Sequence, residues 1–155
     1  MTTRISTLVA GTRVVRVHVD DMNVPRSITV TIAIDDGREW SFEEPGWQEI
    51  SYGVNGEQVY VWSARHLVVL PGSPTASLIE MRTGEDILVV FAIPEGNWLL
   101  VCETSVRLWD GDVNQISVQL DDVTSEIRWE PPVLVVRDQR GVSMRLTVAD
   151  GHLNF

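Results

Sequence analysis

Hydrophobic and polar residues alternate along several short segments of the chain. In residues 27–34, with the sequence SITVTIAI, the side chains of Ile28, Val30, Ile32 and Ile34 share one face. Residues 13–19 and 115–120 alternate in the same way. A period of two is typical of a half-buried β-strand, because successive side chains point to opposite faces of a sheet. No window of a dozen residues has the 3.6-residue period of a helix.

Turn-forming pairs of residues separate these segments. Glycine tolerates positive φ and proline presets φ, so such pairs punctuate strands. The pairs are Asp36-Gly37, Pro45-Gly46, Asn55-Gly56, Pro71-Gly72, Thr83-Gly84, Glu95-Gly96, Asp110-Gly111, Pro131-Pro132, Arg140-Gly141 and Asp150-Gly151. Valine occurs 24 times and alanine only six times, which favours strands over helices. The pattern predicts a single antiparallel all-β domain over residues 1–155.

The turns also suggest an internal repeat. Apolar segments run into glycine at Gly37, Gly72, Gly111 and Gly151, at intervals of 35, 39 and 40 residues. Each interval has room for about four short strands. This indicates a small propeller-like array of four-strand repeats of about 40 residues. A sandwich or a barrel is the alternative, because regular turn spacing also occurs in those folds.

Composition limits the class of protein. The chain has 155 residues, of which 44% are hydrophobic, enough for one domain with its own core. The single cysteine, Cys102, excludes an intramolecular disulfide and a multi-cysteine zinc site. The longest apolar run, residues 87–93, is far shorter than the about 20 residues of a membrane span. The N-terminal segment lacks the long apolar core of a signal peptide, so we expect a cytoplasmic protein.

The net charge is −10, from 22 acidic residues and 12 arginines, with no lysine. Nucleic acids and anionic membranes both need a basic surface, so we expect neither as a partner. An acidic chain suits solubility, a basic protein partner, or both. Exposed edge strands in a short array of repeats would also favour self-association.

The segment DGDVN raises the question of a calcium site. Asp110, Asp112 and Asn114 occupy positions 1, 3 and 5 of an EF-hand loop, and Asp121 falls at position 12. However, position 6 is Gln115 rather than glycine, and both flanking segments are predicted strands rather than helices. We therefore interpret Asp110-Gly111 as a turn between strands, and expect no metal and no cofactor.

No other motif indicates catalysis. Cys102 lies in the apolar segment NWLLVCE, where a buried, unreactive thiol is the simplest interpretation. His18, His66 and His152 are scattered and form no metal-binding pair. The nucleophile-elbow, dinucleotide-binding and phosphate-binding loop motifs are all missing from the sequence. We assign no catalytic residue.

The six tryptophans are the remaining candidates for function. Trp40 and Phe42 share a face of one predicted strand, Trp47 follows shortly after, and Trp129 precedes a Pro-Pro pair. Exposed aromatic side chains are enriched in protein interfaces, so these four residues are candidates for ligand or partner binding. The other tryptophans lie in apolar segments and are predicted core residues: Trp62, Trp98 and Trp109.

Three functions remain open. The first is a non-catalytic interaction protein whose acidic surface meets a basic protein, as an immunity protein does with a basic toxin. The second is a carbohydrate- or small-ligand-binding β module with exposed tryptophans. The third is an unrecognised small hydrolase, in which His18 or His66 would meet an acid and either a serine or Cys102. We favour the first, because every catalytic candidate has a simpler structural explanation.

Overall fold

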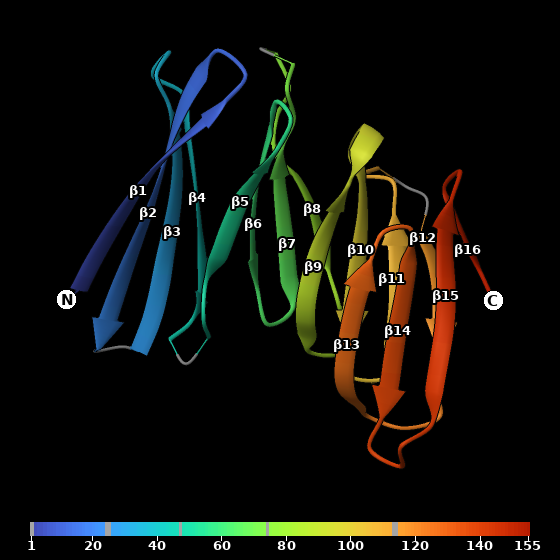
Figure 1. The fold of residues 1–155 in the computed structure, drawn as a ribbon. Helices are drawn as coiled ribbons and strands as arrows, with labels where there is room; N and C mark the ends of the chain where they lie inside the picture. Colours follow the sequence, from blue (N-terminus) through green and yellow to red (C-terminus); the bar gives the residue numbers. More distant parts are fainter. Residues whose placement is uncertain (1, 24–25, 47, 74, 113–114) are drawn as a thin grey trace. The chain divides into compact units, whose positions relative to one another are not determined.

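The structure is a computed structural model, and it describes residues 2–23, 26–46, 48–73, 75–112 and 115–155. It is all-β, and within the described residues the only helical segment is a single 3-10 turn, η1 (Pro94–Gly96). The described residues form sixteen strands, arranged in four antiparallel sheets of four strands each (Figure 1). The prediction of an all-β antiparallel fold built from four-strand repeats is therefore confirmed.

The chain divides into two compact units, unit 1 (Met1–Arg82) and unit 2 (Thr83–Phe155). Each unit contains two sheets, and in every sheet the strands lie in sequence order. The strands of unit 1 are β1 (Thr2–Ala10), β2 (Arg13–Asn23), β3 (Arg26–Ile34) and β4 (Glu39–Pro45), then β5 (Ser51–Asn55), β6 (Gln58–Ser63), β7 (His66–Leu70) and β8 (Ile79–Arg82). The expectation of a single domain stays a prediction.

Unit 2 repeats this arrangement of two four-strand sheets. Its strands are β9 (Ile87–Ile93), β10 (Asn97–Cys102), β11 (Ser105–Trp109) and β12 (Gln115–Gln119), then β13 (Thr124–Glu130), β14 (Val133–Asp138), β15 (Ser143–Ala149) and β16 (His152–Asn154). Sequential pairing by short turns is expected for antiparallel strands, since a hairpin needs only a few residues.

The four glycines that suggest the repeat occupy the same place in each sheet. Gly37, Gly72, Gly111 and Gly151 all lie in the connection between the third and the fourth strand. Each four-strand sheet therefore ends with the strand that follows its glycine. This shared position explains why the intervals between the glycines follow the size of a four-strand sheet.

Alternating burial follows the alternating sequence, as expected for sheets with one covered face. In β6 and β14, every second residue is buried and its neighbours are more exposed. The core of unit 1 is built mainly from valine and isoleucine of β2, β3, β6 and β7. The core of unit 2 joins Leu99, Val101 and Leu108 of one sheet to Leu134, Val136 and Leu146 of the other. In each unit, the apolar faces of two sheets pack together.

No helix in the part of the chain that the structure describes is both long enough and apolar enough to cross a membrane.

Candidate functional site

Two neighbouring depressions in unit 2 form the best candidate for a binding site. They have volumes of about 410 Å³ and 400 Å³, and residues from both sheets of the unit line them. Asn97, Leu108 and Gly151 line both depressions. We call the two together the inter-sheet cleft. Its remaining lining residues are Ile93, Pro94, Val148, Ala149 and Asp150 in one depression, and Asp110, Gln115, Ile116 and His152 in the other.

A two-residue hairpin places Asp150 at the cleft. Ala149 pairs with His152, so Asp150 and Gly151 alone connect β15 to β16. Their φ angles are +51° and +73°, and a type I′ turn requires positive φ at both positions. Aspartate and glycine are among the few residues that adopt this conformation readily. The sequence pair Asp150-Gly151 therefore fixes the local geometry of this rim.

A different turn places Asp110. The Asp112 amide donates a hydrogen bond of 2.9 Å to Asp110 Oδ1, and Trp109 Nε1 donates one of 2.8 Å to the Asp112 carbonyl oxygen. Gly111 has a φ of +79°, and a Cβ atom there would lie 3.4 Å from the Gly96 carbonyl oxygen. The Asp110 side chain thus stabilises the turn after β11 while it lines the cleft.

The cleft combines apolar walls with two carboxylates. Leu108 and Val148 belong to the core of unit 2, so the floor of the cleft is the open end of that core. Asp110 and Asp150 supply the acidic groups, and no arginine is among the described residues that line either depression. A carboxylate beside an apolar wall suits a cation that carries a hydrocarbon chain.

The calcium candidates Asp110 and Asp112 lie in a connection between two strands. Strands β11 and β12 flank residues 110–114, whereas an EF-hand loop joins two helices. Asp110 serves its own turn, Asp112 is exposed, and Asn114 lies outside the described residues. Among the residues that the structure describes, no three His, Cys, Asp or Glu side chains form a group that could hold a metal ion.

The aromatic candidates lie against the cores of their units. Trp40 and Phe42 of β4 are partly buried and pack on the core of unit 1. Trp129 packs on the core of unit 2, and its ring stacks on Phe91 at 5.7 Å between centroids. Trp47 lies outside the described residues. Core packing accounts for the three that are described, and their role in ligand or partner binding stays a prediction.

His66 forms the contact with an acid that the hydrolase hypothesis requires. Its Nδ1 atom donates to Glu44 Oε1 at 2.6 Å, and Phe42 packs edge-on against its ring. Ser63 pairs with His66 across β6 and β7, but Ser63 Oγ and His66 Nε2 form no hydrogen bond with any described residue. The side chains of His66 and Glu44 are 1% and 4% exposed. A substrate could not reach this pair without opening unit 1.

Unit 2 contains a second polar network, around Glu85. Its Oε1 accepts hydrogen bonds from the Thr104 amide at 2.6 Å and the Thr104 hydroxyl at 3.1 Å. Its Oε2 accepts from Ser105 at 3.1 Å and Arg107 at 3.2 Å. Burial raises the pKa of Glu85, but the hydrogen bonds from Thr104, Ser105 and Arg107 together lower it by more. The pKa of Glu85 therefore lies below its ordinary value. The network ties the segment before β9 to β11.

The other catalytic candidates do not form a site. Cys102 is a buried free thiol, and burial raises its pKa to about 11, which opposes formation of a reactive thiolate. His18 lies on β2 opposite Ile5, and His152 is exposed at the rim of the cleft. Sequence reasoning weighed Asp110 as a calcium ligand and preferred a turn there, and it named Asp150 only as a turn residue. It missed the pairing of Glu44 with His66, for which no local signal exists.

Comparison with known proteins gives one structural likeness and no family. No family model matches the chain, and no curated protein matches it. Among solved structures, it is similar to a crystal structure of HIRA residues 644–1017, at 14% sequence identity and a TM-score of 0.48. That match covers 97% of this chain and 52% of the other, so the chain spans about half the length of that protein's structure.

Proposed function

We propose that this protein is a non-catalytic binding protein that holds a basic side chain of a protein partner in the inter-sheet cleft. One observation carries the proposal: the carboxylates of Asp110 and Asp150 line a cleft together with the apolar side chains of Leu108, Ile116 and Val148, and no arginine is among its described lining residues. Arginine and lysine carry long methylene stems, which pack on apolar walls while the charged group reaches a carboxylate. The net charge of −10 would also attract a basic partner over a longer range.

The chemistry favours an arginine over a simple cation. Leu108, Ile116 and Val148 provide apolar contacts for the methylene stem. A guanidinium donates several hydrogen bonds in one plane, so one arginine can engage a carboxylate with two parallel bonds. The amide side chains of Asn97 and Gln115 offer further oxygen acceptors in the cleft. A cytoplasmic location remains part of this proposal, in keeping with the single free thiol.

A peptide titration tests the proposal directly. The isotope-labelled full chain is titrated with acetyl-Leu-Arg-Leu-amide, and backbone amide shifts are followed by NMR. We expect saturable shifts that are largest at Asn97, Leu108 and Gln115. The same peptide with citrulline in place of arginine keeps the shape but loses the charge, so it should bind about tenfold more weakly.

Two double variants separate the cleft from net charge. Asp110→Asn/Asp150→Asn keeps the side-chain acceptor and tolerates positive φ, because asparagine resembles aspartate in both respects. It should weaken peptide binding about tenfold. Glu39→Gln/Glu43→Gln removes the same charge from exposed positions of β4 and should leave binding unchanged. Equal binding of the citrulline peptide, or shifts spread outside the cleft, would reject the proposal.

A further inference from the structure

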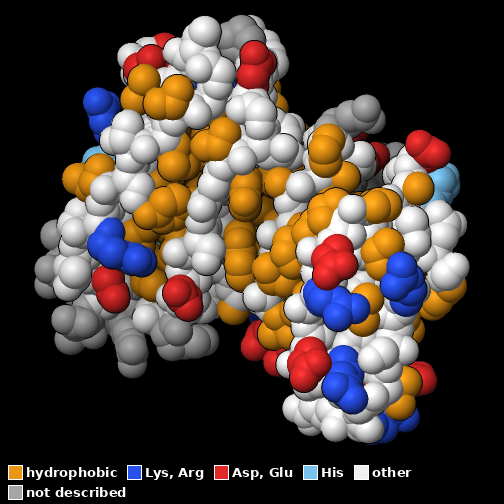
Figure 2. All heavy atoms as spheres, viewed as in Figure 1, with side chains coloured by type: hydrophobic (Ala, Val, Ile, Leu, Met, Phe, Trp, Pro, Cys, Tyr) orange, Lys and Arg blue, Asp and Glu red, His pale blue; other side chains and the backbone are white. Residues whose placement is uncertain are grey.

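The outer face of the last sheet has a charge character unlike the rest of unit 2. Three of the five arginines of unit 2 lie on the strands of this sheet: Arg128 of β13, Arg137 of β14 and Arg145 of β15. By contrast, residues 85–122 contain eight acidic residues and one arginine. Basic side chains gather with a few acidic ones over β13–β15 (Figure 2). A net negative protein therefore presents one sheet face on which cations predominate.

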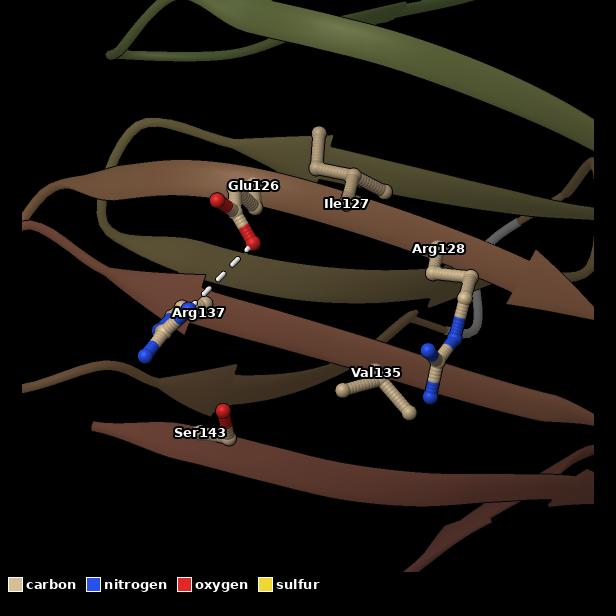
Figure 3. Close-up of a pocket in the computed structure, with 6 residues that line it drawn as sticks. All are labelled: Glu126, Ile127, Arg128, Val135, Arg137 and Ser143. Carbon is tan, nitrogen blue, oxygen red and sulfur yellow. Dashed lines mark ion pairs between the residues drawn. The ribbon is translucent and has the colours of Figure 1, made fainter. Parts of the chain in front are cut away.

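Strand register arranges this face in rows. Arg128 of β13 pairs with Val135 of β14, which in turn pairs with Arg145 of β15. The next row contains Glu126, Arg137 and Ser143. A shallow depression of about 610 Å³ lies over both rows, and Figure 3 shows its lining residues. We call Arg128, Val135, Arg137 and Arg145 the arginine face.

The arginines of this face keep donors for another molecule. The Arg128–Glu130 and Arg137–Glu126 ion pairs both span 3.7 Å, and all four side chains are at least half exposed. Ion pairs of this kind are worth about 0–1 kcal/mol because water screens them. Arg145 is exposed and has no ion-pair partner among the described residues. The face can therefore accept carboxylates without breaking strong internal contacts.

A complementary surface exists on the same unit. The amide of Glu103 donates to the Asp86 carbonyl oxygen at 3.0 Å, and the Thr124 amide donates to the Glu103 carbonyl oxygen at 2.7 Å. These bonds hold three connections side by side at one end of the sheets: residues 83–86, 103–104 and 120–123. Asp121 and Asp122 follow β12 in the third connection, and the carboxylate of each lies 3.7 Å from the guanidinium of Arg140. Ion pairs of this length at partly exposed positions are weak. We call Asp86, Glu103, Asp121 and Asp122 the acidic end.

We propose that the arginine face of one copy of this chain docks on the acidic end of a second copy. Charge complementarity selects this occupant: the chain carries an excess of carboxylates, and the acidic end displays them on loops beside one another. Two different surfaces meet in this contact, so it is head-to-tail and can add further copies. Neither surface includes a residue that lines the inter-sheet cleft, so this inference is independent of the proposed basic partner.

The test measures the mass of the full chain by light scattering as concentration and salt vary. We expect mass to rise with concentration at about 0.01 M salt and to fall to the monomer at about 1 M, since the Debye length shrinks from about 30 Å to about 3 Å. The face variant Arg128→Glu/Arg145→Glu should weaken association at least about tenfold. The control Arg4→Glu/Arg16→Glu changes the net charge equally at exposed positions of unit 1 and should associate more strongly than the face variant.

A charge swap excludes failure to fold as the explanation. The end variant Glu103→Arg/Asp121→Arg should also be monomeric by itself, because its face and its end are both basic. A mixture of the face variant with the end variant restores opposite charges and should associate again. A monomer at every salt concentration, association that survives high salt, or no recovery in the mixture would each overturn the proposal.

Discussion

The two units surround a carboxylate with protein in different ways. In unit 1, Glu44 accepts one hydrogen bond from His66, while His66 Nε2 forms no hydrogen bond with the described residues and lies 3.6 Å from Glu80 Oε2. The nearby Ser63 Oγ has no hydrogen-bond partner among the described residues. In unit 2, the carboxylate of Glu85 accepts four hydrogen bonds and remains 19% exposed. The Glu44 carboxylate is shielded from water and accepts a single hydrogen bond. The Glu85 carboxylate accepts four hydrogen bonds and is still partly exposed to water.

This difference has an energetic consequence. A buried polar network stabilises a fold only when its members are satisfied, because each unpaired atom loses its hydrogen bonds to water. Glu85 keeps water on one side and protein donors on the other, so its ionisation is favoured. The Glu44 and His66 side chains are shielded from water, and the bond between them is the only hydrogen bond that either side chain forms among the described residues. Removing one side chain of the Glu44–His66 pair should therefore lower the free energy of unfolding more than removing one side chain of the Glu85 network.

The largest effect is expected for Glu44→Ala. This change leaves a buried imidazole without its acceptor and should lower the free energy of unfolding by about 3 kcal/mol, as measured by denaturant titration. The matched variant Glu44→Leu/His66→Leu replaces both partners with apolar groups and should stay within about 1 kcal/mol of the wild type. Equal losses in the two variants would mean that packing, rather than the unpaired group, sets the cost.

A smaller and pH-dependent effect is expected for Glu85→Gln. The loss should be about 2 kcal/mol at neutral pH, because the charged acceptor of several hydrogen bonds is removed. The pKa of Glu85 in the folded protein lies below its ordinary value of 4.5. Its contribution is therefore complete above pH 4.5 and is lost as the pH falls through the folded pKa. The gap between wild type and variant should close on acidification.

Denaturant titrations at several pH values measure this gap. Glu130→Gln is the control, because the Glu130 side chain is 77% exposed and its ion pair spans 3.7 Å. That variant should differ little from the wild type at any pH. A gap between wild type and Glu85→Gln that stays constant down to acid pH would contradict the role given to ionised Glu85.

The smallest and sharpest contrast comes from one substitution at two serines. Ser63 and Ser105 are each 1% exposed. Ser105 Oγ donates to Glu85 and accepts from Arg107 Nε at 3.1 Å, so Ser105→Ala should destabilise the fold by about 1 kcal/mol. Ser63 Oγ has no partner among the described residues, so Ser63→Ala should be neutral or stabilising by up to about 1 kcal/mol. Thermal or denaturant unfolding distinguishes the signs, and a matching loss at both sites would remove the contrast between the units.

Local patterns were enough to predict the elements of this fold. Residues 27–34 were predicted as a strand and lie in β3, and residues 115–120 largely coincide with β12. The turn at Asp110-Gly111 was preferred to a calcium loop for reasons of local chemistry, and the hydrogen bond from Asp112 to Asp110 agrees with it. The cleft was harder to predict from the sequence, because Asp110 and Asp150 line it from connections that are far apart in the sequence.

The sequence by itself determined the strands, the turns and the spacing of the repeat, because these depend on alternation over a few residues and on glycine at tight turns. The tertiary structure alone decided which polar groups meet. Glu44 and His66 lie 22 residues apart and come together only when two sheets pack face to face. The rows of the arginine face likewise depend on strand register, since a slip of one residue would turn those side chains to the other side of the sheet.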